Sequence, residues 1–292
     1  MRAIRIDAGL PEAEEVGSEC ANGCGGVWCW RLHALAALFG RAFEGYAVNI
    51  AMDAAALEAK ARVEAVDLAA SVVVVAQGEP AGIVLVSRRG RAARIAAMGI
   101  ARAARARGLG TRVLEQVIAG CRARGDRSLS LEVVEDNVAA VKLYRNAGFE
   151  VRRRLVAWTR PAPQDGGALE ALDEVEPADV ARLVVTDGEP DLPWQLAPET
   201  IAQLTTPHRA FRLGEAFAVI RANTTMVVML SLIVARAARG GGHAKRLLCA
   251  LSAENPGLPM RVPALAPERG SFFPSLGFAR DALTQLDMRM SL

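Results

Sequence analysis

Two stretches of this sequence decide its fold: residues 105–110 are RARGLG, and residues 137–149 are NVAAVKLYRNAGF. In the first stretch, Gly108 and Gly110 lack a Cβ, so the backbone can turn tightly there and approach a ligand closely. The first N–H groups of the helix that follows, together with Arg105 and Arg107, suit an anion such as a diphosphate. A Gly-x-Gly pair is also found at ordinary helix caps, so the context must decide between the two interpretations.

The second stretch predicts a short helix that ends in a glycine. Ala140, Leu143 and Tyr144 fall on one helical face, at spacings of three and four residues. Gly148 is typical of a residue that closes a helix, and Phe149 begins the next strand. Taken alone, this pattern also fits an amphipathic helix with one buried tyrosine.

The surrounding sequence predicts an α/β domain built on one mixed sheet. Hydrophobic periodicity indicates helices over 27–43, 53–64 with Asp53 as N-cap, 110–123 and 138–146, and strands over 71–76, 81–87, 93–100, 128–134 and 149–159. The glycine loop therefore follows the third strand, and position 113 is Val. A Rossmann fingerprint needs G-x-G-x-x-G directly after the first strand, so this context excludes it.

Together and in this order, the two stretches resemble the GNAT superfamily of acetyltransferases, over roughly residues 28–160. The family's motif Q/R-x-x-G-x-G/A is met by Arg105, Gly108 and Gly110, and its later motif N-x-x-A-x-x-L-Y-x-x-x-G-F is met by residues 137–149. The sequence departs from the family at Arg102 and Ala106, where Pro and Gly are frequent. The resemblance implies a mixed, mostly antiparallel sheet flanked by helices, and acetyl-CoA as cosubstrate without a metal.

The resemblance also implies roles for single residues. Tyr144 would protonate the departing thiolate, which suits a phenol that is neutral at pH 7. Met98 and Ile100 would offer backbone groups to the pantetheine arm, and Asn137 would hydrogen-bond the same arm. The complete set of expected acetyl-CoA contacts is Met98, Ile100, Arg105, Ala106, Arg107, Gly108, Leu109, Gly110, Thr111, Asn137, Ala140 and Tyr144.

The base and the acceptor pocket are less sharply indicated. Leu131-Glu132-Val133 resembles the L-E-V string of ribosomal-protein N-terminal acetyltransferases, which makes Glu132 the candidate base; Glu135 is another candidate, and Glu132 could equally be an outward-facing strand residue. In this family the loop between the first two helices, here 43–53, shapes the acceptor pocket. Its polar residues are either acceptor contacts or solvated loop residues: Glu44, Tyr46, Asn49 and Asp53.

The same plan is repeated after a linker at 161–167, which reads PAPQDGG. Residues 100–105 and 234–239 share the string A-R-A-A-R, and Gly148-Phe149 matches Gly277-Phe278, both displaced by about 130 residues. We therefore expect a GNAT domain at 1–160 and a degenerate copy at 168–292. In the copy, strands are expected over 168–172, 210–221, 224–235 and 278–289, and helices over 176–185, 197–204 and 242–252.

The second copy is altered where the chemistry should be. Arg239 to Ala244 keep R-x-x-G-x-A, but Phe273 stands at the position of Tyr144 and Ala266 at that of Asn137. Prolines interrupt the strand–helix segment that carries these roles: Pro263, Pro267 and Pro274. We expect the second copy to be non-catalytic.

Composition narrows the class of protein. The formal net charge of the 292 residues is only +3, which argues against wholesale nucleic-acid binding. The sequence contains no apolar run long enough for a membrane span. Five cysteines, an odd number at scattered positions, suit a reducing compartment, so we expect a cytoplasmic protein. The candidate metal ligands Cys20, Cys24, Cys29 and His33 match no common zinc finger, so we expect no metal site.

These observations predict an N-acetyltransferase that moves acetyl from acetyl-CoA to a primary amine by direct attack in a ternary complex. The acceptor would be a small molecule or a peptide, and a homodimer is compatible with the sequence. The alternative from another class is a non-catalytic acyl-CoA-binding sensor or interaction module. The paired Asn137 and Tyr144 favour the enzyme, because a binding module has no need of a placed acid.

Overall fold

The computed structural model describes residues 2–5, 14–15, 32–46, 52–105, 108–163 and 170–292, and they fall into two compact units. Unit 1 consists of Met1–Arg152 with Asp287–Leu292, and unit 2 consists of Arg153–Leu286. The expected ranges 1–160 and 168–292 differ from this division, because β7 (Glu150–Arg160) and β13 (Ala279–Ser291) each contribute residues to both units.

Unit 1 is built on a mixed sheet. Its strands are β1 (Arg2–Arg5), β2 (Glu14–Glu15), β3 (Val72–Ala76), β4 (Glu79–Arg89), β5 (Ala92–Ile100) and β6 (Ser128–Val134), in the order β2-β1-β3-β4-β5-β6. β3, β4 and β5 form an antiparallel meander, whereas β1 pairs with β3, and β5 with β6, in parallel. Positive φ angles at Gln77 and Gly78 give the β3–β4 hairpin the turn that matches strand twist.

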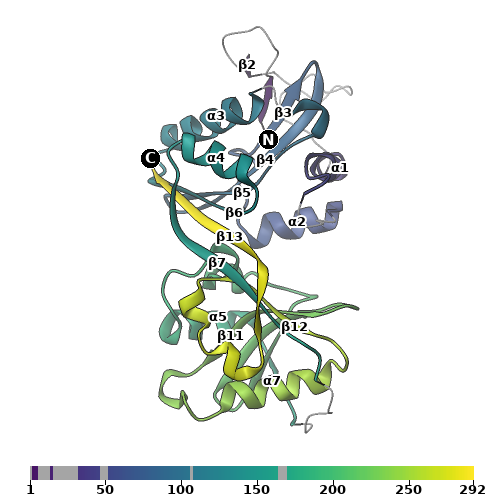
Figure 1. Ribbon diagram of the computed structural model, residues 1–292, viewed down its shortest axis with the longest axis vertical. Coiled ribbons are helices and arrows are strands. Elements are labelled where there is room, and N and C mark those ends of the chain that lie inside the picture. The colour runs from purple at the N-terminus through teal and green to yellow at the C-terminus, as the bar shows by residue number, and fades with distance from the viewer. Residues whose placement is uncertain (1, 6–13, 16–31, 47–51, 106–107, 164–169) are drawn as a thin grey trace. The chain divides into compact units, whose positions relative to one another are not determined.

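Helices cover both faces of this sheet (Figure 1). On one face, α1 (Leu32–Ala42) and α2 (Ala54–Val63) pack against Ile83 and Leu85 of β4; on the other lie α3 (Leu109–Ala123) and α4 (Val138–Asn146). The prediction that Asp53 caps α2 is confirmed, since its carboxylate accepts a hydrogen bond of 2.7 Å from Ala56 N.

The feature of unit 1 that matters most for function is a split between β5 and β6. Parallel pairing joins Ala92–Ile95 to Ser128–Leu131 and then ends. β5 nevertheless continues to Ile100 and β6 to Val134. The two strands thus part in the middle of the sheet, and the turn η1 (Arg102–Ala104) and helix α3 follow directly from the far end of β5.

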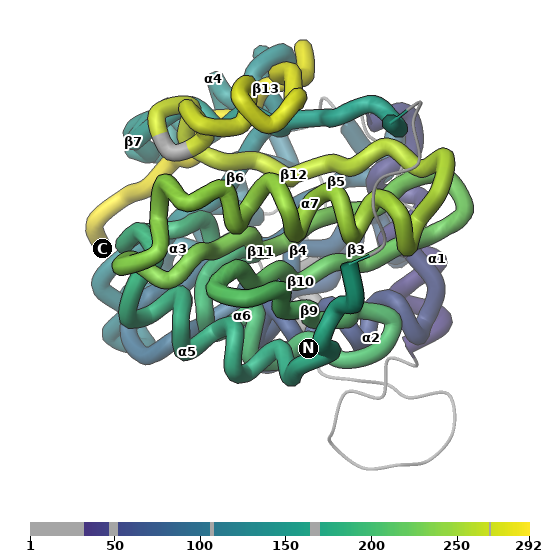
Figure 2. Tube along the Cα trace, turned by 90° about the horizontal axis from the view of Figure 1, so that it is seen from below, coloured from purple at the N-terminus to yellow at the C-terminus, as the bar shows by residue number. Residues whose placement is uncertain are grey.

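Unit 2 repeats this architecture. Its elements are β8 (Asp173–Val175), α5 (Pro177–Asp187), α6 (Pro198–Ile201), β9 (Arg209–Leu213), β10 (Ala216–Ala222), β11 (Val227–Val234), α7 (His243–Glu254) and β12 (Met260–Leu265), with short turns η2 (Trp194–Leu196), η3 (Arg236–Ala238), η4 (Pro267–Gly270) and η5 (Phe273–Leu276). The strand order is β7-β12-β11-β10-β9-β8. Figure 2 shows α7 lying across β9, β10 and β11, with which it is in contact.

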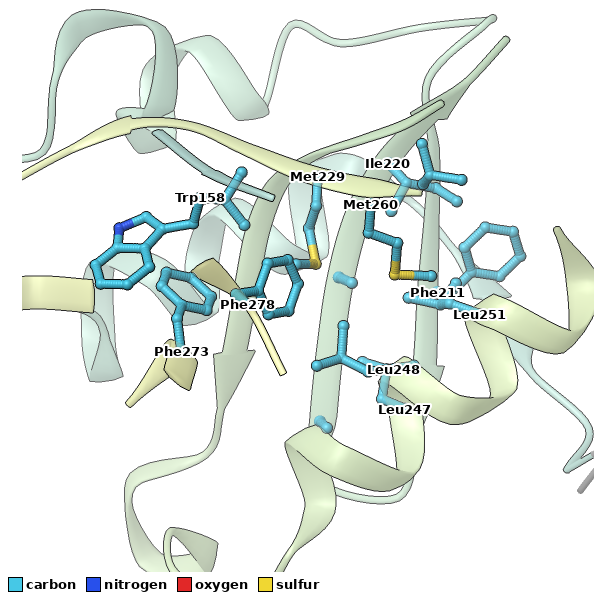
Figure 3. Close-up of a cluster of buried hydrophobic side chains, with 14 of the residues drawn as sticks. Trp158, Phe211, Ile220, Met229, Leu247, Leu248, Leu251, Met260, Phe273 and Phe278 are labelled. Atoms are coloured by element: carbon cyan, nitrogen blue, oxygen red, sulfur yellow. The ribbon is translucent and has the colours of Figure 1, made fainter. Parts of the chain in front are cut away.

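The core of unit 2 lies between α7 and the sheet. Ala216, Ala218 and Ile220 alternate along β10 and so share the face that packs against Leu247, Leu248 and Leu251 of α7. Figure 3 shows that Trp158, Phe273 and Phe278 extend this cluster at one end, and Phe211 and Met260 at the other.

Three expectations for the second half were wrong in detail. Of the strand expected over 168–172, residues 168 and 169 lie outside the described residues and 170–172 are not in a strand; β8 spans Asp173–Val175. The helix expected over 197–204 spans only Pro198–Ile201. Strand β12 was not predicted at all, because it contains Pro263. The β7–β12 register shifts between Val262 and Leu265, so the proline, which has no N–H to donate, falls in the irregular part of the ladder.

The effect expected from the other prolines is confirmed. Where unit 1 has the regular helix α4, unit 2 has the two separate turns η4 and η5, which contain Pro267 and Pro274. No helix in the described ranges of either unit is long and apolar enough to cross a membrane.

Candidate functional site

A cavity of about 560 Å³ fills the split between β5 and β6 in unit 1, beside the start of α3 and the buried face of α4. Its walls include most of the acetyl-CoA contacts expected from the sequence, namely Met98, Ile100, Arg105, Gly108, Leu109, Gly110, Asn137, Ala140 and Tyr144. Of the other described candidates, Thr111 and Glu132 are not among the lining residues. Ala106 and Arg107 lie outside the described residues.

The start of α3 forms one end of this cavity. Gly108, the N-cap, has φ 72° and ψ 1°, a left-handed conformation that glycine adopts without strain. No side chain caps the helix, so its first N–H groups and the positive end of its dipole are available to an anion. A Cβ on Gly110 would lie 3.3 Å from Leu143 Cδ2, so this glycine also allows α3 to approach α4.

Arg105 has a different role from the one its charge suggested. Its Nε donates to Ile100 O at 2.8 Å, and its Nη2 donates to Ala42 O at 3.1 Å and Glu44 O at 3.3 Å. The guanidinium thereby joins the glycine loop to the end of β5 and to the C-terminal carbonyls of α1. Arg105 thus shapes the cavity by fixing three segments of backbone.

Tyr144 lies in the wall formed by α4 and is only 7% exposed. Its ring meets Phe149 edge-on, with ring centroids 5.8 Å apart. Burial raises the pKa of its phenol well above the ordinary value, and nearby Tyr46 raises it further. The hydroxyl is therefore protonated at neutral pH and can donate its proton where negative charge develops.

Tyr46, which follows α1, lines the same cavity. Burial raises the pKa of its phenol, and a hydrogen bond with the Val134 backbone lowers it by less, so the pKa stays above its ordinary value. Its ring stands perpendicular to that of Phe43 at 5.6 Å. The chain has only two tyrosines, and both line this one cavity.

Asn137 combines a structural role with its place in the wall. Its Oδ1 accepts a hydrogen bond of 3.2 Å from Ala140 N and so caps α4. This explains why asparagine stands three residues before Ala140, because an N-cap side chain bonds the N–H two or three positions on. The cap also fixes the first turn of the helix that carries Tyr144.

Glu132, two residues before Val134 of the cavity wall, belongs to a buried ion-pair network. Its Oε2 is 2.6 Å from Nη2 of Arg94, whose Nη1 is 2.8 Å from Glu64. Burial lowers the pKa of the Arg94 guanidinium, but the two carboxylates more than offset this and hold it above its ordinary range. Glu132 is thus bound to a permanent cation, and its role as a base stays a prediction.

The sequence interpretation missed Gly99, which also lines the cavity, as does Phe43, the first residue of the expected acceptor loop. A Cβ on Gly99 would lie 2.8 Å from Phe43 Cε2, so the missing side chain lets α1 approach β5. An isolated glycine inside a strand often marks such a close approach, and that signal was present in the sequence. Of the acceptor-loop candidates, Asp53 is a helix cap and Asn49 lies outside the described residues.

The candidate metal ligands lie mostly outside the described residues as well. Cys20, Cys24 and Cys29 belong to that part of the chain, and His33 lies on α1.

Unit 2 reproduces the geometry of this site with altered side chains. Gly242 caps α7 with φ 77° and ψ 2°, as Gly108 caps α3. Arg239 donates to Val234 O at 3.3 Å and to Asp187 O, as Arg105 donates to Ile100 O and Ala42 O.

The aromatic position is also reproduced. Phe278 N donates to Phe273 O at 3.1 Å, and Phe149 N donates to Tyr144 O at 3.0 Å. Phe273 therefore occupies the backbone position of Tyr144, as the sequence predicts, and brings no proton to it.

Residues 32–149 match the model of the acetyltransferase (GNAT) family. Among solved structures, this chain is similar to a GCN5-related N-acetyltransferase from Sphaerobacter thermophilus, with 15% sequence identity and a TM-score of 0.63. The match covers 89% of this chain and 92% of that protein's chain. A tandem GNAT protein from the clavulanic acid biosynthesis pathway has 14% identity and a TM-score of 0.63, covering 89% and 94%. No curated protein matches the chain. At these identities, the likeness to the two structures shows the fold, including its tandem arrangement.

Proposed function

Residues 32–149 match the model of the acetyltransferase (GNAT) family, and we propose that they transfer an acetyl group from acetyl-CoA to a primary amine by direct attack in a ternary complex. The observation that carries this proposal is the buried phenol of Tyr144 in the wall of the unit 1 cavity. Its raised pKa keeps the hydroxyl protonated at neutral pH, so the proton is present when negative charge develops on the departing sulfur.

The walls of the cavity fit acetyl-CoA as a substrate. The uncapped start of α3, with Gly108 and Gly110, would hold the diphosphate by backbone N–H groups. The part of β5 beyond Ile95, which no longer pairs with β6, would offer Met98 and Ile100 to the amides of the pantetheine arm as an added strand would. Asn137 and Ala140 line the same passage.

The chemical step needs one nucleophile and one acid. The neutral amine nitrogen attacks the thioester carbonyl carbon, the carbon–sulfur bond breaks, and the departing sulfur takes the Tyr144 proton. The acetylated nitrogen then loses its extra proton, which restores the tyrosine hydroxyl directly or through water. Glu132 is the proposed base for the incoming ammonium, acting through water because Arg94 holds its carboxylate.

The acceptor would be a small molecule or peptide that carries the amine. Tyr46 and Asp136, which line the same cavity as Tyr144, can accept hydrogen bonds from such a group. The rings of Phe43 and Tyr46, whose centroids are 5.6 Å apart, both line the cavity, and such bulk favours a short acyl group.

The test is CoA release from acetyl-CoA by the full-length chain, over a panel of peptides with free N-termini, lysine-containing peptides, polyamines and amino sugars. We expect release with at least one amine class, and initial rates that depend on both substrates in the intersecting pattern of a ternary complex. Calorimetric binding of acetyl-CoA without release on any amine would contradict the proposal and favour a non-catalytic binding module.

A further inference from the structure

Unit 2 contains a cavity of about 790 Å³, larger than the 560 Å³ of the site in unit 1. It lies where β11 and β12 part. Their parallel pairing covers only Val227 with Met260 and Val228 with Arg261, although β11 continues to Val234 and β12 to Leu265. The split therefore starts earlier than in unit 1, where four residue pairs join the strands.

One end of this cavity is suited to an anion. Gly242 begins the 12-residue helix α7 without a side-chain cap, and Lys245 lines the cavity in the first turn. His243 also lines it, and its buried Nδ1 has no hydrogen-bond partner within the described part of the chain. Helix N–H groups, a lysine and an imidazole are together typical of a phosphate site.

The middle of the cavity lacks the catalytic group. Phe273, 2% exposed, stands at the backbone position of Tyr144, and Ala266 stands where Asn137 caps α4. A phenyl ring cannot protonate a thiolate, so a thioester bound here would have no acid to help its sulfur leave.

The rest of the lining is largely apolar, and a glycine stands where unit 1 has a bulky ring. In unit 1, Arg105 donates to the carbonyl oxygen of Ala42, and the bulky Phe43 follows Ala42 in the chain. In unit 2, Arg239 donates to the carbonyl oxygen of Asp187, and Gly188 follows Asp187. A Cβ on Gly188 would lie 2.3 Å from Val184 O, so the backbone itself excludes a larger residue. Beside Gly188 and Glu189, the cavity is lined by a set of apolar side chains that we call its far end: Val184, Leu192, Leu196, Leu230, Leu232 and Ile233.

We propose that unit 2 binds an acyl-CoA whose acyl chain is longer than acetyl, and holds it without transferring the acyl group. The diphosphate would lie at the start of α7 and the acyl chain among the leucines at the far end. The assignment of CoA rests on the proposed function of unit 1, whose acetyl-CoA site has the same backbone geometry.

The experiment is calorimetry on the full-length chain with octanoyl-CoA as the probe, in the presence of saturating acetyl-CoA to occupy unit 1. We expect one octanoyl-CoA per chain. Leu230→Trp, which fills the far end, should abolish this binding, and Lys245→Glu should weaken it about tenfold by removing one charged contact. Leu230→Ala and Lys245→Arg are the matched controls and should retain it.

Free CoA and octanoate serve as competitors that each match one end of the cavity. Both should compete only weakly, because each leaves the other end empty. Octanoyl-CoA binding that is unchanged in Leu230→Trp and Lys245→Glu would overturn the proposal, as would octanoate that binds as tightly as octanoyl-CoA. Circular dichroism and Tm check that each variant folds.

This outcome is separable from the activity of unit 1. Leu230→Trp should release CoA from acetyl-CoA as fast as the wild-type chain does. Failure of the second site would then appear as lost binding with normal turnover, and failure of the proposed function as absent turnover with normal octanoyl-CoA binding.

Discussion

Tyr144, the proposed acid, and Tyr46 are the two phenols that line the cavity of unit 1. They are the only two tyrosines in the sequence, and burial raises the pKa of each phenol. The spacing N-x-x-A-x-x-L-Y pointed to Tyr144 from the sequence alone. The neighbourhood of Tyr46 was not readable there, because it depends on a contact with Val134, far away in the chain.

Alkaline titration of phenolate absorbance tests these two environments. In denatured protein both tyrosines should ionise near pH 10, whereas in the folded chain both should ionise at higher pH. Since the unfolded state loses these protons first, the stability that the two protonated phenols contribute is present below about pH 10 and declines as the pH rises further. In the Tyr46→Phe variant, Tyr144 is the only tyrosine that gives a phenolate signal. If it ionised at the same pH as in denatured protein, this would contradict its burial.

Glu132 shows what residue patterns miss. Leu131-Glu132-Val133 suggested a base, but Arg94, 38 residues earlier, binds its carboxylate. Arg94 also binds Glu64. Burial alone would raise the pKa of the Glu64 carboxyl, but the positive charges of Lys60 and Arg94 more than offset this effect and lower the pKa. Such a network joins two strands and a helix end, so it follows from the fold and not from any local motif.

Replacing Glu132 by Gln should lower the free energy of unfolding by about 1–3 kcal/mol, because the buried Arg94 loses a charged acceptor. Urea unfolding measures this change. Ser130→Ala, on the same face of β6, is the matched control and should cost less, since the Ser130 hydroxyl makes only a 3.4 Å contact with Ala93 O. Equal stability of wild type and Glu132→Gln would show that the ion pair is not formed as described.

At the scale of elements, prediction worked best where helix and strand signals agreed with capping residues. β6 and α4 begin and end where the sequence predicts, at Ser128–Val134 and Val138–Asn146, because Asn137 caps the helix and Gly148 closes it with φ 94°. β12 escaped prediction because a proline within a strand reads as a break. Only the register shift beside Pro263 shows how the ladder accommodates it.

The cap of α4 should be worth a measurable part of the stability. Asn137→Ala removes the acceptor for Ala140 N, and we expect a loss of about 1 kcal/mol in urea unfolding. Asn137→Asp is the control, because its carboxylate can accept the same hydrogen bond and should keep most of the stability. An alanine variant as stable as the wild type would mean that the cap contributes nothing to the helix that carries Tyr144.

At the scale of the whole molecule, the two units share their backbone geometry but differ in the side chains at the positions of Asn137 and Tyr144. The glycine caps, the arginines that join loop to helix end, and the glycine before each terminal strand recur in both units. The string A-R-A-A-R and the Gly-Phe pair, displaced by similar distances, together indicated this repeat from the sequence. The widened cavity of unit 2 was not detectable there, since it depends on where the pairing of β11 and β12 stops. Because Phe273 cannot supply a proton, we expect one catalytic site per chain, with Tyr144 as its proposed acid.

The most direct test of this account measures acetyl-CoA affinity and turnover together in Tyr144→Phe. The substitution removes only the hydroxyl, so we predict an unchanged Kd for acetyl-CoA by calorimetry and a fall in kcat of about 100-fold or more in CoA release with the best amine. Turnover equal to that of the wild type, with the same Kd, would contradict both the role of Tyr144 and the assignment of catalysis to unit 1.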